Sequence, residues 1–191
     1  MVRLGFIVEG ATEKIILEQS DFFDYLQTSG IDYVPEVIDA HGNGNLLPHN
    51  IQPLSDVLTN KGATHVVILT DLDKDQCITK TKTRIAALPN HSVVVSEKVI
   101  ESWFLSDTDA MRAFLKDPAY NHNTPETLAD PFGEIKAIRM AKNGLGVSGK
   151  VILANTMVKS CGFSIQKAAQ HPKCNSAKYF LKKIEEISKN P

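Results

Sequence analysis

The chain has 191 residues, of which 42% are hydrophobic and 23% charged, and its formal net charge is −1 at pH 7. This length suits one compact domain with a modest extension. No run approaches the ~18 apolar residues of a membrane helix, and Glu9 interrupts an N-terminal apolar run that is too short for a signal peptide, so we expect a cytoplasmic protein with no membrane partner. Three widely spaced cysteines without a CxxC pair argue against a zinc site and a disulfide framework.

The small net charge hides an uneven distribution. Residues 1–110 carry 16 acidic and 8 basic side chains, whereas residues 111–191 carry 6 acidic and 13 basic ones. An acidic first part and a basic second part suggest a metal-binding region joined to a region that holds an anion such as nucleic acid. Mutual pairing of the two surfaces within the fold is the alternative.

The first 116 residues predict four successive strand–helix units. Short apolar strands are expected at 3–8, 33–39, 65–70 and 92–96, and helices at about 12–28, 48–60, 76–88 and 100–115, the last interrupted at Ser106-Asp107. Pro35 favours an edge position for the second strand, because proline has no N–H to donate. This alternation predicts an α/β fold, with a parallel four-stranded sheet covered by helices on both faces. In such sheets ligands bind at the carboxyl ends of the strands.

The remaining residues, 117–191, show no strand rhythm and predict a basic, mostly helical extension packed on the first domain. Helices are expected from Thr124-Pro125-Glu126, over 132–142, 151–159 and 163–169, and from a cap at Ser176 onward. Three glycines between residues 144 and 149 form a loop that ends at Lys150. The predicted organisation is therefore a metal-binding domain, 1–116, followed by this C-terminal extension.

The first motif with chemical content is EGATE, residues 9–13. Glu9 directly follows a buried strand, where a carboxylate needs a partner. Gly10 permits a tight turn and a close approach of a ligand. Glu13 lies in the first turn of the following helix, where it is either functional or complements the helix dipole.

The second motif is DLDKD, residues 71–75, at the end of the third strand. If the chain is still extended there, Asp71 and Asp73 point the same way. Acids packed this closely repel one another, and a divalent cation with oxygen ligands is the usual compensation. Asp75 is better explained as a solvated loop residue.

DLDKD also resembles the start of two motifs that carry different chemistry. An EF-hand calcium loop needs Gly at its sixth position and Glu at its twelfth, and Gln76 and Lys82 stand there instead, which excludes it. Phosphatases of the haloacid dehalogenase type use the first Asp of DxDx(T/V) as nucleophile, but Asp75 occupies the fifth position. A phosphatase with Asp71 as nucleophile remains an alternative to a magnesium site.

The two motifs together resemble the TOPRIM domain of topoisomerases, primases and related nucleases, in which one strand ends in Glu-Gly and a parallel strand ends in Asp-x-Asp. IVEGATE is similar to the EGxTE form of overcoming-lysogenization-defect nucleases and of small TOPRIM-like proteins of bacterial defence systems. IESWFLSD, residues 100–107, resembles a segment of the RloB-like and DUF4276 families. The resemblance to DUF4276 covers most of the chain, which lacks the ATPase domain of the long nucleases and the tyrosine-bearing domain of topoisomerases.

The resemblance implies roles for individual residues. Glu9 matches the TOPRIM glutamate, a general acid/base or a metal ligand, and Asp71 and Asp73 match the metal-binding pair. Glu13 matches the second acid of the nuclease motif, and Glu101 matches the acid before the tryptophan. At the end of the fourth strand, Glu97 is a further candidate ligand and Lys98 a candidate catalytic residue that neutralises a phosphate.

These observations lead us to expect Mg²⁺-dependent (or Mn²⁺-dependent) phosphodiester hydrolysis on DNA or RNA, in a bacterial defence setting. The basic extension would contact phosphates through Arg139, Lys142 and Lys150, with Lys159 and Lys167. A separate ATPase or other defence-system protein is a compatible partner, since the chain has no GxxxxGK[ST] motif of its own. The alternative is a non-catalytic metal-binding subunit that acts through a partner.

Overall fold

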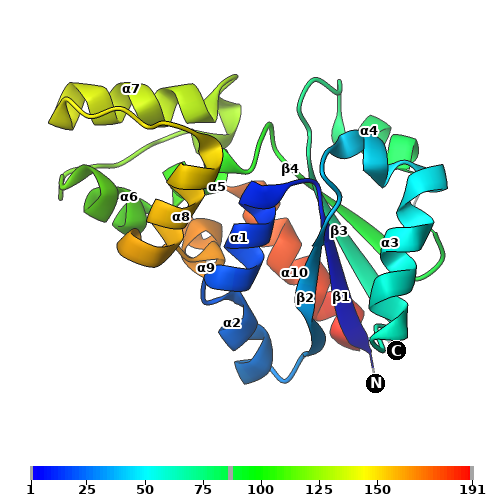
Figure 1. Ribbon diagram of the computed structural model, residues 1–191. Helices are drawn as coiled ribbons and strands as arrows, with labels where there is room; N and C mark the ends of the chain where they lie inside the picture. The colour runs from blue at the N-terminus through cyan, green and yellow to red at the C-terminus, as the bar shows by residue number, and fades with distance from the viewer. Residues whose placement is uncertain (1, 86–87, 190–191) are drawn as a thin grey trace.

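The computed structural model describes residues 2–85 and 88–189 and shows an α/β fold (Figure 1). Four parallel strands form one sheet in the order β2-β1-β3-β4. The strands are β1 (Arg3–Val8), β2 (Asp32–Asp39), β3 (His65–Asp71) and β4 (His91–Ser96). The predicted parallel four-stranded sheet is confirmed, and β2, which contains Pro35, lies at an edge as predicted.

Alternate side chains of the strands enter two separate cores, because successive residues of a strand point to opposite faces. Phe6 and Leu69 belong to the larger core, whereas Ile7 and Ile68, their neighbours in sequence, belong to the smaller one. Both faces are therefore apolar, which explains why the central strands lack a polar face. The smaller core lies under α3 (Pro48–Asn60) and α4 (Ile78–Ile85), on the right of the sheet in Figure 1.

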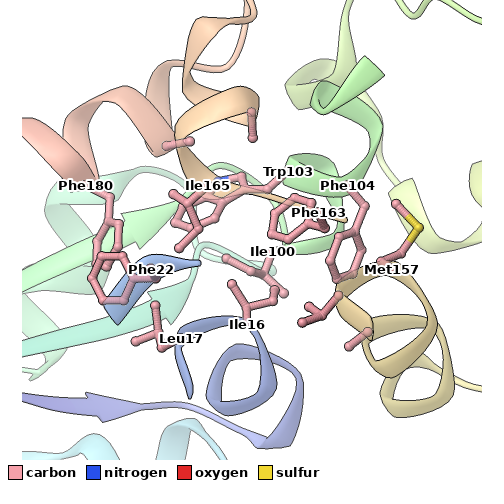
Figure 2. Close-up of a cluster of buried hydrophobic side chains, with 14 of the residues drawn as sticks. Ile16, Leu17, Phe22, Ile100, Trp103, Phe104, Met157, Phe163, Ile165 and Phe180 are labelled. Carbon is pink, nitrogen blue, oxygen red and sulfur yellow. The ribbon is translucent and has the colours of Figure 1, made fainter. Parts of the chain in front are cut away.

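The larger core lies on the other face and includes residues from both ends of the chain. Its helices before residue 116 are α1 (Ala11–Gln19), α2 (Phe22–Thr28), α5 (Glu101–Ser106) and α6 (Thr108–Leu115). Those after it are α7 (Pro131–Asn143), α8 (Lys150–Cys161), α9 (Ile165–Gln170) and α10 (Asn175–Lys189). Figure 2 shows Phe180 of α10 beside Phe22, and Met157 of α8 near Phe104. The C-terminal extension thus shares its core with the first domain.

Some predicted helix boundaries differ from the structure. The first helix is two, because the chain breaks at Ser20, whose Oγ accepts the N–H of Phe22 at 3.2 Å. The expected helix at Thr124 is only a 3₁₀ turn, η2 (Pro125–Thr127), whereas the separate helix predicted over 132–142 is present as α7. The predicted third helix is shorter than expected, and residues 86–87 of that prediction lie outside the described residues.

The break predicted at Ser106-Asp107 is present and has a clear cause. Asp107 ends α5 and caps α6, with Oδ1 accepting the N–H of Ala110 at 3.0 Å. Its other oxygen accepts the N–H of Ser164 at 2.9 Å, just before α9. One carboxylate therefore joins three helices. A further short helix, η1 (Asn43–Leu46), lies in the loop after β2.

A buried carboxylate joins η2 to the last helix. Glu126 accepts the N–H of Asn175 at 2.6 Å and that of Ser176 at 2.9 Å, and also the Ser176 hydroxyl. Ser176 in turn accepts the indole N–H of Trp103 at 2.7 Å. Glu126 thus satisfies the free N–H groups at the start of α10 from a distant part of the chain. Trp103 is fully buried, as expected of a core residue.

The chain leaves β1 and β3 toward opposite faces of the sheet. After β1 it enters α1 on the larger core, and after β3 it enters α4 on the smaller core. Neighbouring strands that diverge in this way leave a crevice at their carboxyl ends, which is the usual ligand site of open parallel sheets. Among the described residues, no helix is long and apolar enough to cross a membrane.

Candidate active site

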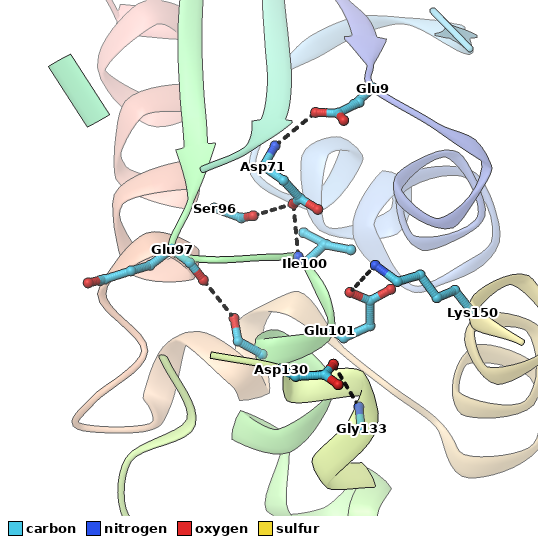
Figure 3. Close-up of polar contacts among 10 residues, drawn as sticks. Glu9, Asp71, Ser96, Glu97, Ile100, Glu101, Asp130, Gly133 and Lys150 are labelled. Carbon is cyan, nitrogen blue, oxygen red and sulfur yellow. Dashed lines mark hydrogen bonds and ion pairs between the residues drawn. The ribbon is translucent and has the colours of Figure 1, made fainter. Parts of the chain in front are cut away.

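A cleft of about 470 Å³ lies at this divergence, between α1, α8 and the loop after β2. The candidate ligands predicted from both sequence motifs, and the acid two residues before Trp103, all line it, although they come from three separate segments. The lining carboxylates and the one lysine are Glu9, Glu13, Asp39, Asp71, Asp73, Glu101 and Lys150. Figure 3 shows Glu9, Asp71, Glu101 and Lys150 from their different elements.

Glu9 is held at the end of β1 by the neighbouring strand. Its N–H donates to the carbonyl of Leu69 at 3.1 Å, which continues the β1–β3 ladder by one residue. Its side-chain Oε2 accepts the hydroxyl of Thr70 at 2.6 Å and the N–H of Asp71 at 3.2 Å. The pairing register therefore places the Glu9 carboxylate directly against the end of β3.

Asp71 is the last residue of β3 and only 7% exposed. It pairs with Ser96 of β4, whose hydroxyl donates to Asp71 Oδ1. The same oxygen accepts the N–H of Ile100 at 2.9 Å, just before α5 (Figure 3). Among the described residues no donor reaches Oδ2, so the hydrogen bonds of the protein fix only one of the two oxygens.

Glu101, the second residue of IESWFLSD, is fully buried in the first turn of α5. Its Oε2 accepts a hydrogen bond from the Lys150 ammonium at 3.1 Å, which also forms an ion pair. Its Oε1 is buried with no hydrogen-bond partner in the described part of the chain. A buried carboxylate oxygen without a donor is costly, so Glu101 needs a proton, a water or a ligand at this oxygen.

The electrostatics of the cleft reflect burial and mutual repulsion. Burial raises the pKa of Glu13 to about 8, with the charges of Glu9 and Glu101 adding to the effect. Burial, followed by the charge of Glu13, raises the pKa of Asp71 well above its usual range. Burial also raises the pKa of Glu101, and Lys150 partly counteracts this. Ionisation of these carboxyl groups is therefore unfavourable in the cleft, and additional positive charge nearby would make it less so.

Lys150 supplies the local positive charge. Partial burial lowers the pKa of its ammonium, but the carboxylates of Glu101, Asp71 and Glu13 outweigh this and raise it overall. Of the five basic residues expected to contact nucleic acid, Lys150 is the one that lines the cleft. Arg139 lies instead over the ring of Phe114, and Lys142 pairs with Asp117 at 2.7 Å.

The extended geometry expected for Asp71 and Asp73 is not present. Strand β3 ends at Asp71, and Asp73 has a left-handed backbone with φ of 50°, its N–H bonded to the carbonyl of Lys98. Asp73 still lines the cleft, but at its exposed rim, whereas Asp71 is buried. Asp75 bonds Arg84 and Thr81 of α4, in agreement with its assignment outside the site.

Two other candidates from the end of β4 lie elsewhere. Lys98 is not among the residues that line the cleft, and it contributes its backbone carbonyl to Asp73. Glu97 lines a separate pocket with Val95 and Tyr179, where burial and then the charge of Glu126 raise its pKa. The turn after β4 therefore directs these two side chains away from Asp71.

Sequence reasoning missed several residues of the cleft. Asp39 ends β2, so the strand-end rule that identified Glu9 and Asp71 also applies to it. Gly42 follows, with φ of 115°, and its N–H donates to the Glu9 carbonyl at 2.7 Å. Only a residue without Cβ adopts this backbone readily, so the loop can close against Glu9. Nothing in the sequence indicates that Val151 lines the cleft, because its position there depends on where α8 begins and how it packs.

The donor chemistry of the cleft suits Mg²⁺ or Mn²⁺, because both prefer carboxylate oxygens. Glu9, Asp71 and Glu101 each have an oxygen without a protein donor in the described residues. As the side chains stand, no group of three or more His, Cys, Asp or Glu in residues 2–85 and 88–189 is arranged to hold a metal ion. Binding would require side-chain adjustment, such as release of Glu101 by Lys150.

Comparison with known proteins adds no assignment. No protein-family model matches the chain, and neither a curated protein nor a solved structure matches it. The resemblance to TOPRIM-like proteins consequently rests on the sequence motifs, and the function of this chain has to be inferred from the cleft itself.

Proposed function

We propose that the protein is a Mg²⁺-dependent or Mn²⁺-dependent phosphodiesterase that acts on nucleic acid. The observation that carries the proposal is the convergence of the buried acids Glu13, Asp71 and Glu101 with Glu9 and Lys150 in one cleft. This convergence occurs where ligands bind in open parallel sheets. Acids that share a cleft at such a cost are typical of functional sites.

The proposed division of labour follows from the hydrogen bonds. Glu9, Asp71 and Glu101 would each hold the metal through the carboxylate oxygen that has no protein donor. The other oxygen of Glu9 is held by the Thr70 hydroxyl, and the other oxygen of Asp71 by the Ser96 hydroxyl and a backbone N–H. When bound, the metal ion would activate water and neutralise charge on the phosphoryl group. In a site where Asp71 and Glu101 alone hold the metal, the free oxygen of Glu9 would instead accept a proton from the attacking water, because Glu9 is the least buried of these three carboxylates.

Lys150 would change partners when substrate enters. It now donates to Glu101 at 3.1 Å, and its side chain is about half exposed. A phosphate oxygen at the cleft would compete for the same ammonium, since lysine binds phosphate as a point charge. Release of Glu101 would leave that carboxylate free to act as a ligand.

The test is cleavage of single-stranded DNA, RNA and structured RNA with Mg²⁺ or Mn²⁺, in wild type and in Asp71→Asn. We expect metal-dependent cleavage by wild type and a loss of at least about 100-fold in the variant, because one metal ligand is removed. Asp75→Asn is the matched control. It removes a carboxylate of the same motif that pairs with Arg84 outside the cleft, so it should retain activity.

The proposal fails if wild type cleaves no better than Asp71→Asn on any of these substrates. The non-catalytic alternative predicts a different pattern, namely metal binding without turnover until a partner is added. Calorimetric titration with Mn²⁺, done alongside the cleavage assay, separates the two.

A further inference from the structure

The first turn of α8 has no side-chain cap and begins with a cation. Its N-cap is Gly149, a residue that is common at this position but has no side chain to accept a backbone N–H. Its first residue is Lys150, a cation at the positive end of the helix dipole, which is unfavourable for the helix. Val151 and Ile152 follow and are 46% and 56% exposed. A local charge that opposes the helix dipole is a violation of the kind that concentrates at functional sites.

This turn lies at the mouth of the cleft. Lys150 and Val151 line it, and Glu101, which is fully buried with Oε1 unpartnered among the described residues, lies next to the Lys150 ammonium. The Lys150 side chain therefore connects the start of this twelve-residue helix to a buried carboxylate that has one unpartnered oxygen. Free N–H groups at a helix start favour an anion such as phosphate. The exposed Val151 and Ile152 add an apolar surface that a phosphate alone would not use.

The depth of the cleft limits what can enter. Asp71, Glu13 and Glu101 are 7%, 5% and 0% exposed, so a reacting phosphate must descend into the cleft to reach them. A space of about 470 Å³ is of the size that holds a small ligand or one nucleotide unit. A duplex keeps its bases stacked and carries a second strand alongside, whereas an unpaired strand can bend a phosphate inward and expose a base.

We infer that the first turn of α8 binds a phosphate and the adjoining nucleoside of an unpaired strand, so that the substrate class is single-stranded nucleic acid. This inference rests on the proposed function and narrows it. The backbone N–H groups and Lys150 hold the phosphate, and Val151 and Ile152 contact the base or sugar. Apolar contact of this kind tolerates any sequence, because every base has an apolar face.

The test measures binding by fluorescence anisotropy, in Ca²⁺ to suppress turnover, with a labelled oligonucleotide of about 15 nucleotides, a length that spans one typical single-strand site, and the matched duplex. We expect wild type to bind the single strand at least about tenfold more tightly. The double variant Val151→Thr/Ile152→Thr should lose about fivefold in single-strand affinity, because threonine removes apolar contact without adding charge. Val57→Thr on α3 is the control, since Val57 is 40% exposed but lies outside the cleft, and it should leave affinity within about twofold.

Equal or tighter binding of the duplex, binding of neither oligonucleotide, or equal affinities in the double variant and Val57→Thr would overturn the inference. Thermal melting of each variant checks that it is folded. Metal-dependent cleavage by wild type, measured separately, distinguishes the two proposals. If cleavage persists while the strand preference is absent, only this inference fails, and if no substrate is cleaved, the proposed function fails first.

Discussion

At the scale of single residues, the same hydrogen-bonding arrangement occurs at three carboxylates of the cleft, those of Asp71, Glu9 and Glu101. Each has an oxygen bound by donors of this chain and an oxygen to which no described residue donates. The fixed oxygen holds the side chain in one orientation, and the second stays available. The proposed metal site would use these second oxygens.

Glu13 gives a prediction about pH at this scale. Its pKa in the folded chain is about 8, against an ordinary value of 4.5. The unfolded chain therefore loses this proton at lower pH than the folded chain does, so the stability associated with it declines as pH rises between those two values. In EDTA, the free energy of unfolding of wild type should fall over this window by at least about 1 kcal/mol more than that of Glu13→Gln.

Urea unfolding at three pH values across this window, from the acidic to the alkaline end, measures this difference. A Gln side chain cannot ionise, so the variant should show the flatter profile. Parallel profiles of unfolding free energy against pH for the two proteins would contradict the raised pKa of Glu13. Glu18→Gln provides a control, because Glu18 is a partly exposed acid on the same helix.

At the level of elements, the last helix is positioned by a residue far from it in sequence. Glu126 lies in η2, yet its two oxygens accept the first N–H groups of α10, and Ser176 links the same group to Trp103. The predicted cap at Ser176 is wrong, because α10 already begins at Asn175 and the Ser176 hydroxyl donates to Glu126 instead of accepting a backbone N–H. Packing of α10 on the sheet depends on this buried group as well as on its apolar stripe.

We expect Glu126→Gln to lower the free energy of unfolding by about 3 kcal/mol. Glutamine has one acceptor oxygen, so its amide would face one of the two N–H groups that Glu126 now accepts. Denaturant unfolding gives the magnitude, and hydrogen exchange in α10 should accelerate most. Glu185→Gln, which alters a partly exposed hydrogen bond to Tyr25, should cost no more than about 1 kcal/mol.

At the scale of the whole molecule, the cleft forms where the chain leaves the sheet toward the two cores on its opposite faces. β1 and β3 are neighbouring strands whose following segments run to opposite faces of the sheet. Helix α8, from the C-terminal part of the chain, lines the cleft between these segments. The site is thus made by the N-terminal and C-terminal parts together. A ligand bound there contacts both parts and should stabilise the fold as a unit.

Mg²⁺ should accordingly raise the stability of wild type relative to EDTA. At a hundredfold excess over the dissociation constant the expected gain is about 2.7 kcal/mol. Asp71→Asn should lose most of this gain, and Asp75→Asn should keep it, because only Asp71 lies in the cleft. Thermal unfolding with and without the metal checks the prediction, and an equal shift in both variants would point to unspecific binding.

Local sequence pattern is sufficient to predict the strands and most of the acids of this protein. Apolar runs that end in Glu9 and Asp71 predict two parallel strands with carboxylates at one edge, because strand direction places equivalent ends together. The motif before Trp103 points to Glu101 through its resemblance to known segments. The strand predictions succeed because they depend on local pattern and on the few topologies that parallel sheets allow.

Long-range packing, by contrast, selects which basic side chains meet the acids. Arg139, Lys142 and Lys150 are alike in sequence terms, yet packing directs the first onto Phe114, the second onto Asp117 and the third onto Glu101. Likewise, the backbone turn at Asp73 leaves that acid at the rim, and Lys98 stays outside the cleft. These outcomes depend on contacts between distant segments and on single φ angles. The local pattern of apolar and polar residues contains no information about either.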